Sequence, residues 1–147
     1  CAFIIPAPIR GISPTNSVLK SKFDPHLPSI VVPLTVASAD GKSRLTIPAV
    51  LDTGASLTLI SSQLAMSLGY SLRSRKRQTM FTGSRKETCP IVRISRIEAL
   101  GVVCHNLEVL CHELPKGSGI TALLGLNFLK RFDYCIHSSK GVIAINF

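Results

Sequence analysis

The stretch Ala49-Val50-Leu51-Asp52-Thr53-Gly54-Ala55-Ser56 places a carboxylate directly after an apolar strand and before a glycine-bearing turn. Burial of the Asp52 carboxylate in such a place is unfavourable unless hydrogen-bond donors reach it, and the backbone amides of a tight turn near Gly54 can supply them. A lone Asp-Thr-Gly triplet is equally compatible with an ordinary turn that ends a strand. The triplet therefore predicts either a catalytic carboxylate or a structural turn.

Short apolar strands and turn signals recur along most of the chain, which indicates an all-β domain with two short helices. The first expected elements are strands at 29–37 and 43–51 around a turn at 39–42, a strand at 57–60, and a helix that Ser61 or Ser62 caps and Gly69 ends. They are followed by a hairpin at 78–90, strands at 91–97 and 102–110, an apolar strand at 121–124 that ends at Gly125, a helix at 126–132 and a strand at 142–147.

The chain contains both Val50–Ala55 and, later, Leu123-Leu124-Gly125. The occurrence of both favours the catalytic carboxylate over the structural turn. With this order of strands, hairpin and helices, residues 29–147 resemble the retropepsin-like (retroviral-type, clan AA) single-domain aspartic peptidases. The resemblance implies an all-β, closed β-barrel-type acid-protease fold with one or two short helices, active as a homodimer. It also implies an aspartic endopeptidase that hydrolyses peptide bonds in polypeptide substrates.

The resemblance assigns roles to individual residues of this sequence. Asp52 matches the catalytic aspartate, Thr53 the residue that ties the two active-site loops together, and Gly54 the glycine of close approach. Leu123, Leu124 and Gly125 match the apolar strand and glycine that pack behind the catalytic loop. Substrate contacts are expected from Ala55 and from a covering flap formed by Met80, Phe81, Thr82, Gly83 and Ser84.

The chemistry of this class needs two carboxylates that share a proton and activate a water molecule. The chain has four aspartates and four glutamates but a single Asp-Thr-Gly. Asp24, Asp40 and Asp133 lack the surrounding loop sequence of a partner, so a second copy of Asp52 must come from a second subunit across a twofold axis. Ala55 offers no hydroxyl to the carboxylate, and we therefore expect activity at mildly acidic to neutral pH.

Composition leaves two other functions open. A formal charge of +9, with the basic run Arg73–Arg77, is compatible with a nucleic-acid-binding domain. Without aromatic residues between the basic ones, a solvated basic surface is the better interpretation, so we expect no nucleic-acid partner. The other alternative is a catalytically weak retropepsin-like module for dimerisation or peptide binding.

The remaining expectations concern the N-terminus, the cysteines and the surroundings of the protein. Residues 1–28 carry five prolines and are expected to form an extended arm before the domain at 29–147. Five scattered cysteines suggest free thiols and a cytoplasmic location. Because Cys104 and His112 would share one strand face and His105 and Cys111 the other, we expect no metal site, and we expect neither a cofactor nor a membrane span.

Overall fold

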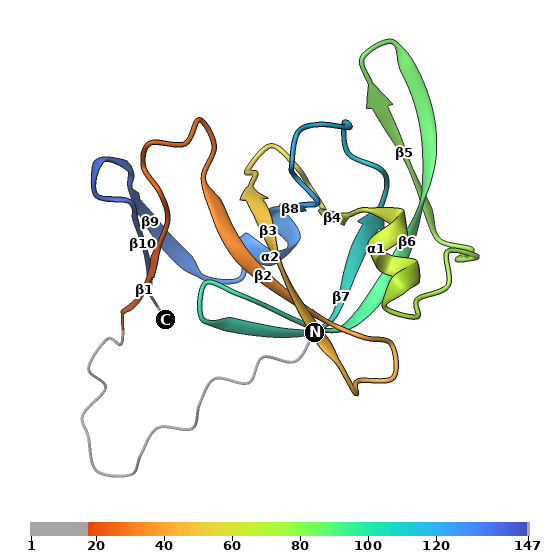
Figure 1. The fold of residues 1–147 in the computed structure, drawn as a ribbon, viewed down its shortest axis with the longest axis horizontal. Helices are drawn as coiled ribbons and strands as arrows, with labels where there is room; N and C mark the ends of the chain where they lie inside the picture. The colour runs from red at the N-terminus through yellow and green to blue at the C-terminus, as the bar shows by residue number, and fades with distance from the viewer. Residues whose placement is uncertain (1–17, 147) are drawn as a thin grey trace.

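Strands dominate residues 18–146, which are the part of the chain that the computed structural model describes (Figure 1). Six of them close into a barrel with the order β2-β3-β8-β4-β7-β6, because β2 also pairs with β6. The all-β prediction and the barrel are thus confirmed. The barrel strands are β2 (Val31–Ala37), β3 (Arg44–Leu51), β4 (Thr58–Ile60), β6 (Arg85–Ala99), β7 (Val102–Cys111) and β8 (Ala122–Leu124).

Alternating apolar residues of these strands fill the barrel interior. Leu34 and Val36 of β2 are fully buried, as are Ile94 and Ile97 of β6, which lies antiparallel to β2. Leu34 and Val36 are two apart on their strand and therefore point to the same face of the sheet. The turn between β6 and β7 consists of Leu100 and Gly101, both with positive φ, as expected of a two-residue hairpin turn that fits the twist of its strands.

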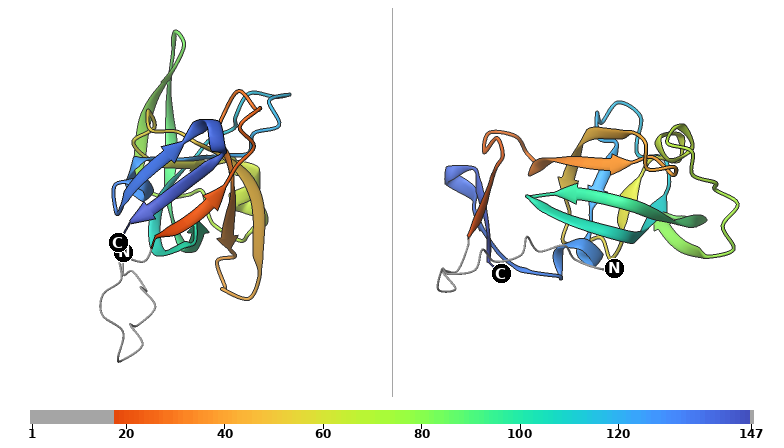
Figure 2. Two further views of the ribbon diagram at one scale, coloured as in Figure 1. Left: turned by 90° about the vertical axis from the view of Figure 1, so that its left-hand side faces the viewer. Right: turned by 90° about the horizontal axis from the view of Figure 1, so that it is seen from below.

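A second sheet, of three strands, lies beside the barrel (Figure 2). It consists of β1 (Leu19–Lys22), β10 (Val142–Asn146) and β9 (Asp133–His137), with β10 in the middle. β1 belongs to the predicted arm, and residues 1–17 of that arm lie outside the described residues. The boundary at residues 28 and 29 stays a prediction.

The predicted hairpin at 78–90 is present and projects from the barrel (Figure 1). Its strands are β5 (Arg77–Thr82) and the first part of β6, paired from Arg77↔Pro90 to Thr82↔Arg85. The prediction of a separate strand at 91–97 was wrong, because β6 runs without a break from the hairpin into the barrel. Pro90 does not end the ladder, since the next N–H, that of Ile91, donates to the carbonyl of Lys76 at 2.9 Å. We call residues 77–90 the β5–β6 hairpin.

The helices are short. α1 (Ser62–Ser67) is capped by Ser61, whose hydroxyl accepts the Leu64 N–H at 3.1 Å, and the chain leaves it through Gly69 at φ 85°. α2 (Leu126–Leu129) ends three residues earlier than predicted. Beyond it Phe132 packs edge-on against Phe128, and the chain turns into β9. No helix within residues 18–146 is long and apolar enough to cross a membrane.

Gly141 tests how the N-terminal segment is held against the three-stranded sheet. A side chain at Gly141 would collide with the Phe23 carbonyl oxygen and the Pro25 ring, whereas one at Gly41 would meet nothing within 4 Å. Both glycines have positive φ, so Ala is strained by backbone conformation at either site. We expect Gly141→Ala to lower the free energy of unfolding by about 1–3 kcal/mol more than Gly41→Ala, because only Gly141→Ala adds overpacking. Urea denaturation measures both, and equal losses would contradict the close packing.

Candidate active site

Asp52 lies where two central strands of the barrel end together. β3 and β8 are parallel, with Val50 opposite Leu123 and Leu51 opposite Leu124. The Asp52 N–H continues this ladder by donating to the Leu124 carbonyl at 3.0 Å. The backbone of the aspartate is therefore fixed by the strand that carries the predicted supporting residues.

The Asp52 carboxylate receives a donor from its own turn. Its Oδ1 accepts the Gly54 N–H at 2.9 Å, and its backbone carbonyl accepts the Ala55 N–H at 3.3 Å. A Cβ on Gly54 would approach Oδ1 to 3.2 Å, so this position favours glycine. The carboxylate is half-buried, and Thr53 is exposed at the front of the turn. We call residues 52–57 the Asp52 loop.

Gly125 allows the Asp52 loop to lie directly on the start of α2. A Cβ at Gly125 would come within 2.5 Å of the Leu57 carbonyl carbon and oxygen, which is closer than any side chain can approach. Leu126 and Asn127 donate their N–H groups to the carbonyls of Ala55 and Ser56, at 2.8 and 3.1 Å. The first amides of α2, which no helical carbonyl can satisfy, are thus bonded by the Asp52 loop.

Thr58 and Asn127 complete this attachment, and neither was among the site residues predicted from the sequence. The fully buried Thr58 hydroxyl accepts the Gly125 N–H at 3.1 Å and donates to Asn127 Oδ1 at 2.9 Å. Oδ1 also accepts the Thr58 N–H at 2.7 Å, and Asn127 Nδ2 donates to the Glu108 carbonyl at 2.7 Å. A signal was available, because Thr58 is the single polar residue in Leu57–Ile60 and Asn127 follows Gly125 by two.

A groove of about 220 Å³ opens between the Asp52 loop and the β5–β6 hairpin. Gly54 and Ala55 line it on one side, and Met80 and Phe81 on the other. Phe81 is 76% exposed, whereas Met80 packs against apolar residues at the base of the hairpin. Of the other predicted substrate contacts, Thr82 ends β5, and Gly83 and Ser84 form the turn at the hairpin tip. Leu123 lines the groove, while Leu124 is fully buried behind it.

An ion pair fastens the start of the β5–β6 hairpin to β7. Lys76 Nζ lies 2.6 and 2.8 Å from the two Glu108 carboxylate oxygens, and Arg93 lies 3.6 Å from one of them. The hydrogen bond from Lys76, aided by its charge and by Arg93, lowers the pKa of the Glu108 carboxyl despite partial burial. The Glu108 carbonyl also accepts a hydrogen bond from Asn127. Glu108 therefore connects the β5–β6 hairpin with Asn127, which supports the Asp52 loop.

The other aspartates lie in different parts of the fold. Asp24 accepts the His26 N–H at 2.9 Å, and Asp133 begins β9. Asp40 accepts the Ser38 hydroxyl at 2.6 Å and the Lys42 N–H at 3.0 Å in the turn between β2 and β3, and these bonds lower the pKa of its carboxyl. None of these three aspartates lines the groove, which leaves Asp52 as the aspartate beside it.

No cysteine within residues 18–146 forms a disulfide, in agreement with their scattered spacing. Burial raises the pKa of the Cys89 and Cys104 thiols, and that of Cys111 to about 12. These side chains are protonated at neutral pH and are not poised as nucleophiles.

The closed barrel, the Asp-Thr-Gly turn and the paired apolar strand before Gly125 define a retropepsin-like domain. Residues 37–131 match the family described as "gag-polyprotein putative aspartyl protease", and the chain belongs to this family. Its fold is similar to that in the crystal structure of a retropepsin-like aspartic protease from Rickettsia conorii, with a TM-score of 0.65 and 20% identity. That similarity covers 89% of this chain and 91% of the other. No curated protein sequence matches.

Thr58→Val tests the buried hydroxyl while keeping the shape of the side chain. Loss of the hydroxyl leaves the Gly125 N–H without its acceptor, and we expect the free energy of unfolding to fall by about 1–3 kcal/mol. Thr58→Ser is the matched control, because it retains both hydrogen bonds and loses only a methyl group. Chemical denaturation compares the two, and equal destabilisation would show that packing matters there and the hydrogen bonds do not.

Gly125→Ala tests the close approach of the Asp52 loop to α2. Gly125 has φ −96°, so Ala suffers no backbone strain and any loss of stability comes from the collision with Leu57. We expect a loss of several kcal/mol, or no folded protein, because the obstructing atoms belong to the backbone. Gly54→Ala is the control, since its Cβ would meet only the end of the Asp52 side chain. Thermal unfolding should then show a much smaller loss for Gly54→Ala.

Proposed function

We propose that the protein is an aspartic endopeptidase that cuts flexible polypeptide with a pair of Asp52 carboxylates, one from each subunit of a homodimer. The observation that carries the proposal is the position of Asp52. Its backbone is held by β8, its carboxylate is bonded by the turn, and a groove of about 220 Å³ adjoins its loop. Membership of an aspartyl protease family supports the same chemistry.

The reaction would use the shared proton of the two carboxylates. One Asp52, ionised, accepts a proton from a water molecule as it attacks the peptide carbonyl carbon, while the other, protonated, donates to the carbonyl oxygen. The tetrahedral intermediate then collapses as the amide nitrogen takes up a proton and leaves. Two carboxylates this close titrate as a pair, so their protonation belongs to the dimer and to neither chain alone.

The need for a second subunit follows from the aspartates. Asp24, Asp40 and Asp133 are each bonded or placed away from the groove. The Asp52 loop is partly exposed on the same side of the barrel as the hairpin tip, as Figure 1 shows. A twofold axis beside that loop would bring two Asp52 side chains together, as an isologous interface requires.

The β5–β6 hairpin would act as the flap over the bound peptide. Within the described residues, β5 pairs with β6 and with no other strand, so the hairpin can bend without disrupting the barrel ladder. Met80 and Phe81 line the groove opposite the Asp52 loop. The exposed basic residues Arg85 and Lys86 at the hairpin tip would favour acidic substrates.

Asp52→Asn tests the proposal. The amide keeps the size of the carboxylate and its ability to accept the Gly54 N–H, but it cannot share the catalytic proton. We expect the variant to lose cleavage of a peptide library, sampled between about pH 4 and 8, by several orders of magnitude while it remains folded and dimeric. Mass spectrometry of the peptides and analytical ultracentrifugation provide the two measurements. Undiminished cleavage would remove the proposed mechanism.

Mixing wild type with Asp52→Asn distinguishes a shared site from one site per chain. In an equal mixture with free exchange of subunits, about one quarter of the dimers carry two aspartates, so the activity falls to about half that of the wild-type chains alone. If each chain carried a complete site, the added variant would leave the activity unchanged. A dimer that binds peptide in both forms and cleaves in neither would instead identify a peptide-binding module.

A further inference from the structure

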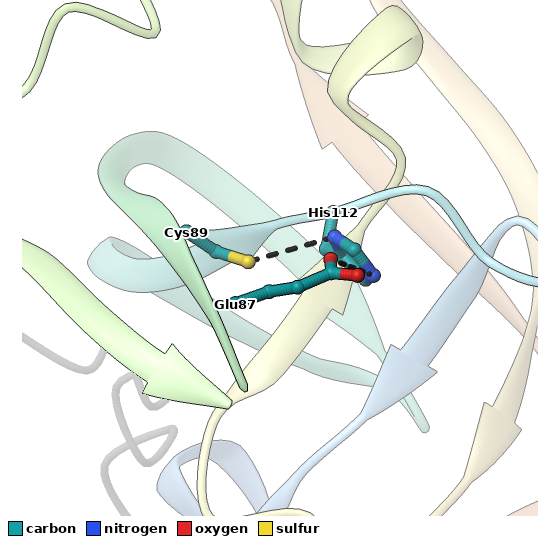
Figure 3. Close-up of side chains that lie close together, drawn as sticks. All are labelled: Glu87, Cys89 and His112. Carbon is teal, nitrogen blue, oxygen red and sulfur yellow. Dashed lines mark hydrogen bonds and ion pairs between the residues drawn. The ribbon is translucent and has the colours of Figure 1, made fainter. Parts of the chain in front are cut away.

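Three side chains at the base of the β5–β6 hairpin point toward one another: Glu87, Cys89 and His112 (Figure 3). Cys89 Sγ lies 3.5 Å from His112 Nδ1, and Glu87 Oε2 lies 3.4 Å from His112 Nε2. One ligand atom from each residue can be chosen so that all three atoms lie within 4.8 Å of one another. No other group of three metal-ligating side chains is this close within residues 18–146.

The β6–β7 ladder explains why these residues meet. Ile91 pairs with Leu110, and the same register continued by two residues sets Cys89 opposite His112. Glu87 precedes Cys89 by two on β6 and therefore points to the same face. The cysteines and histidine near His112 in the sequence lie on β7, and its partners across the ladder were therefore not predicted.

We propose that Glu87, Cys89 and His112 bind a zinc ion that fastens the base of the β5–β6 hairpin to the barrel. A thiolate, an imidazole and a carboxylate are typical zinc ligands, and three of them leave the fourth tetrahedral position to water. With zinc bonds of about 2.3 Å to sulfur and about 2.0–2.1 Å to nitrogen, tetrahedral coordination sets the two atoms about 3.5 Å apart. The Sγ–Nδ1 separation matches this value.

The surroundings suit a cation that binds sulfur and nitrogen. Cys89 is 4% exposed and packs in an apolar cluster with Leu59, Ile91 and Leu110, which shields one side of the site from water. Glu87 and His112 are partly exposed, so an ion can enter from solvent. On binding, the Cys89 thiol releases its proton to solvent, and the Glu87 carboxylate turns from the Nε2 side of the ring toward the metal.

The site connects a projecting element to a fixed one. Glu87 and Cys89 lie on the hairpin, paired with Met80 and Gln78. His112 belongs to the barrel, because its backbone N–H donates to the Ile60 carbonyl at 3.1 Å. A zinc ion across this joint would restrain the hairpin strand opposite Met80, which lines the groove, and would lower the rate of cleavage. This effect on cleavage rests on the proposed function, whereas zinc binding does not.

Zinc titration of the reduced protein tests the site. We expect one zinc ion per chain by calorimetry, a rise in the thermal unfolding temperature, and a thiolate-to-metal absorption band when cobalt(II) replaces zinc. Cys89→Ser, His112→Gln and Glu87→Gln should each weaken binding at least about tenfold. Cys135→Ser and His137→Gln, at exposed positions of β9, are the matched controls and should bind as the wild type does.

The outcomes separate the site from its effect. The zinc site would be overturned if the wild type showed no saturable binding, or if the three site variants bound zinc as tightly as the wild type. It would also be overturned if the β9 controls lost as much affinity as the site variants. Asp52→Asn should bind zinc as the wild type does. A wild-type protein that binds zinc but cleaves no peptide would contradict the proposed peptidase and leave the zinc site intact. If zinc binds wild type but slows its cleavage no more than that of Cys89→Ser, the restraint on the hairpin is wrong.

Discussion

The close contact between Gly125 and the backbone at Leu57 and Thr58 is the constraint on which the rest of the site depends. Because no side chain separates the two segments, the Thr58 hydroxyl reaches both the Gly125 N–H and Asn127. These bonds are shielded from water, where hydrogen bonds are strong and unpaired groups are costly. They fix the Asp52 loop against α2, and the adjacent β3–β8 ladder fixes the backbone at the end of β3, where Asp52 follows.

The same network extends to the element that faces the aspartate. Asn127 bonds the backbone of Glu108, and the Glu108 side chain holds Lys76 at the start of the β5–β6 hairpin. On the second strand of that hairpin, Cys89 and Glu87 meet His112 of the barrel. The hairpin is thus free at its tip and attached at its base on both strands. In the proposed enzyme, the base attachments would set how far the tip can rise for a substrate.

Local patterns were sufficient for much of the architecture. Alternation and turn residues predicted the barrel strands, Ser61 and Gly69 marked the ends of α1, and the hairpin followed from its central glycine. Other elements carried no such signal. β1 is almost wholly exposed, so no apolar alternation marks it, and it exists as a strand through its pairing with β10. β6 continues through Pro90 because Lys76, distant in sequence, supplies the next acceptor.

The sequence by itself placed the carboxylate of Asp52 after an apolar strand and predicted that a catalytic pair would need a second subunit. A single Asp-Thr-Gly after an apolar strand, a second apolar strand before Gly125, and the lack of another suitable aspartate are all visible in the chain. Only the tertiary structure decided which polar residues support the site and which cluster beside it. Thr58 meets Asn127, and Cys89 meets His112, because ladders and close backbone contacts join segments that lie far apart in the sequence.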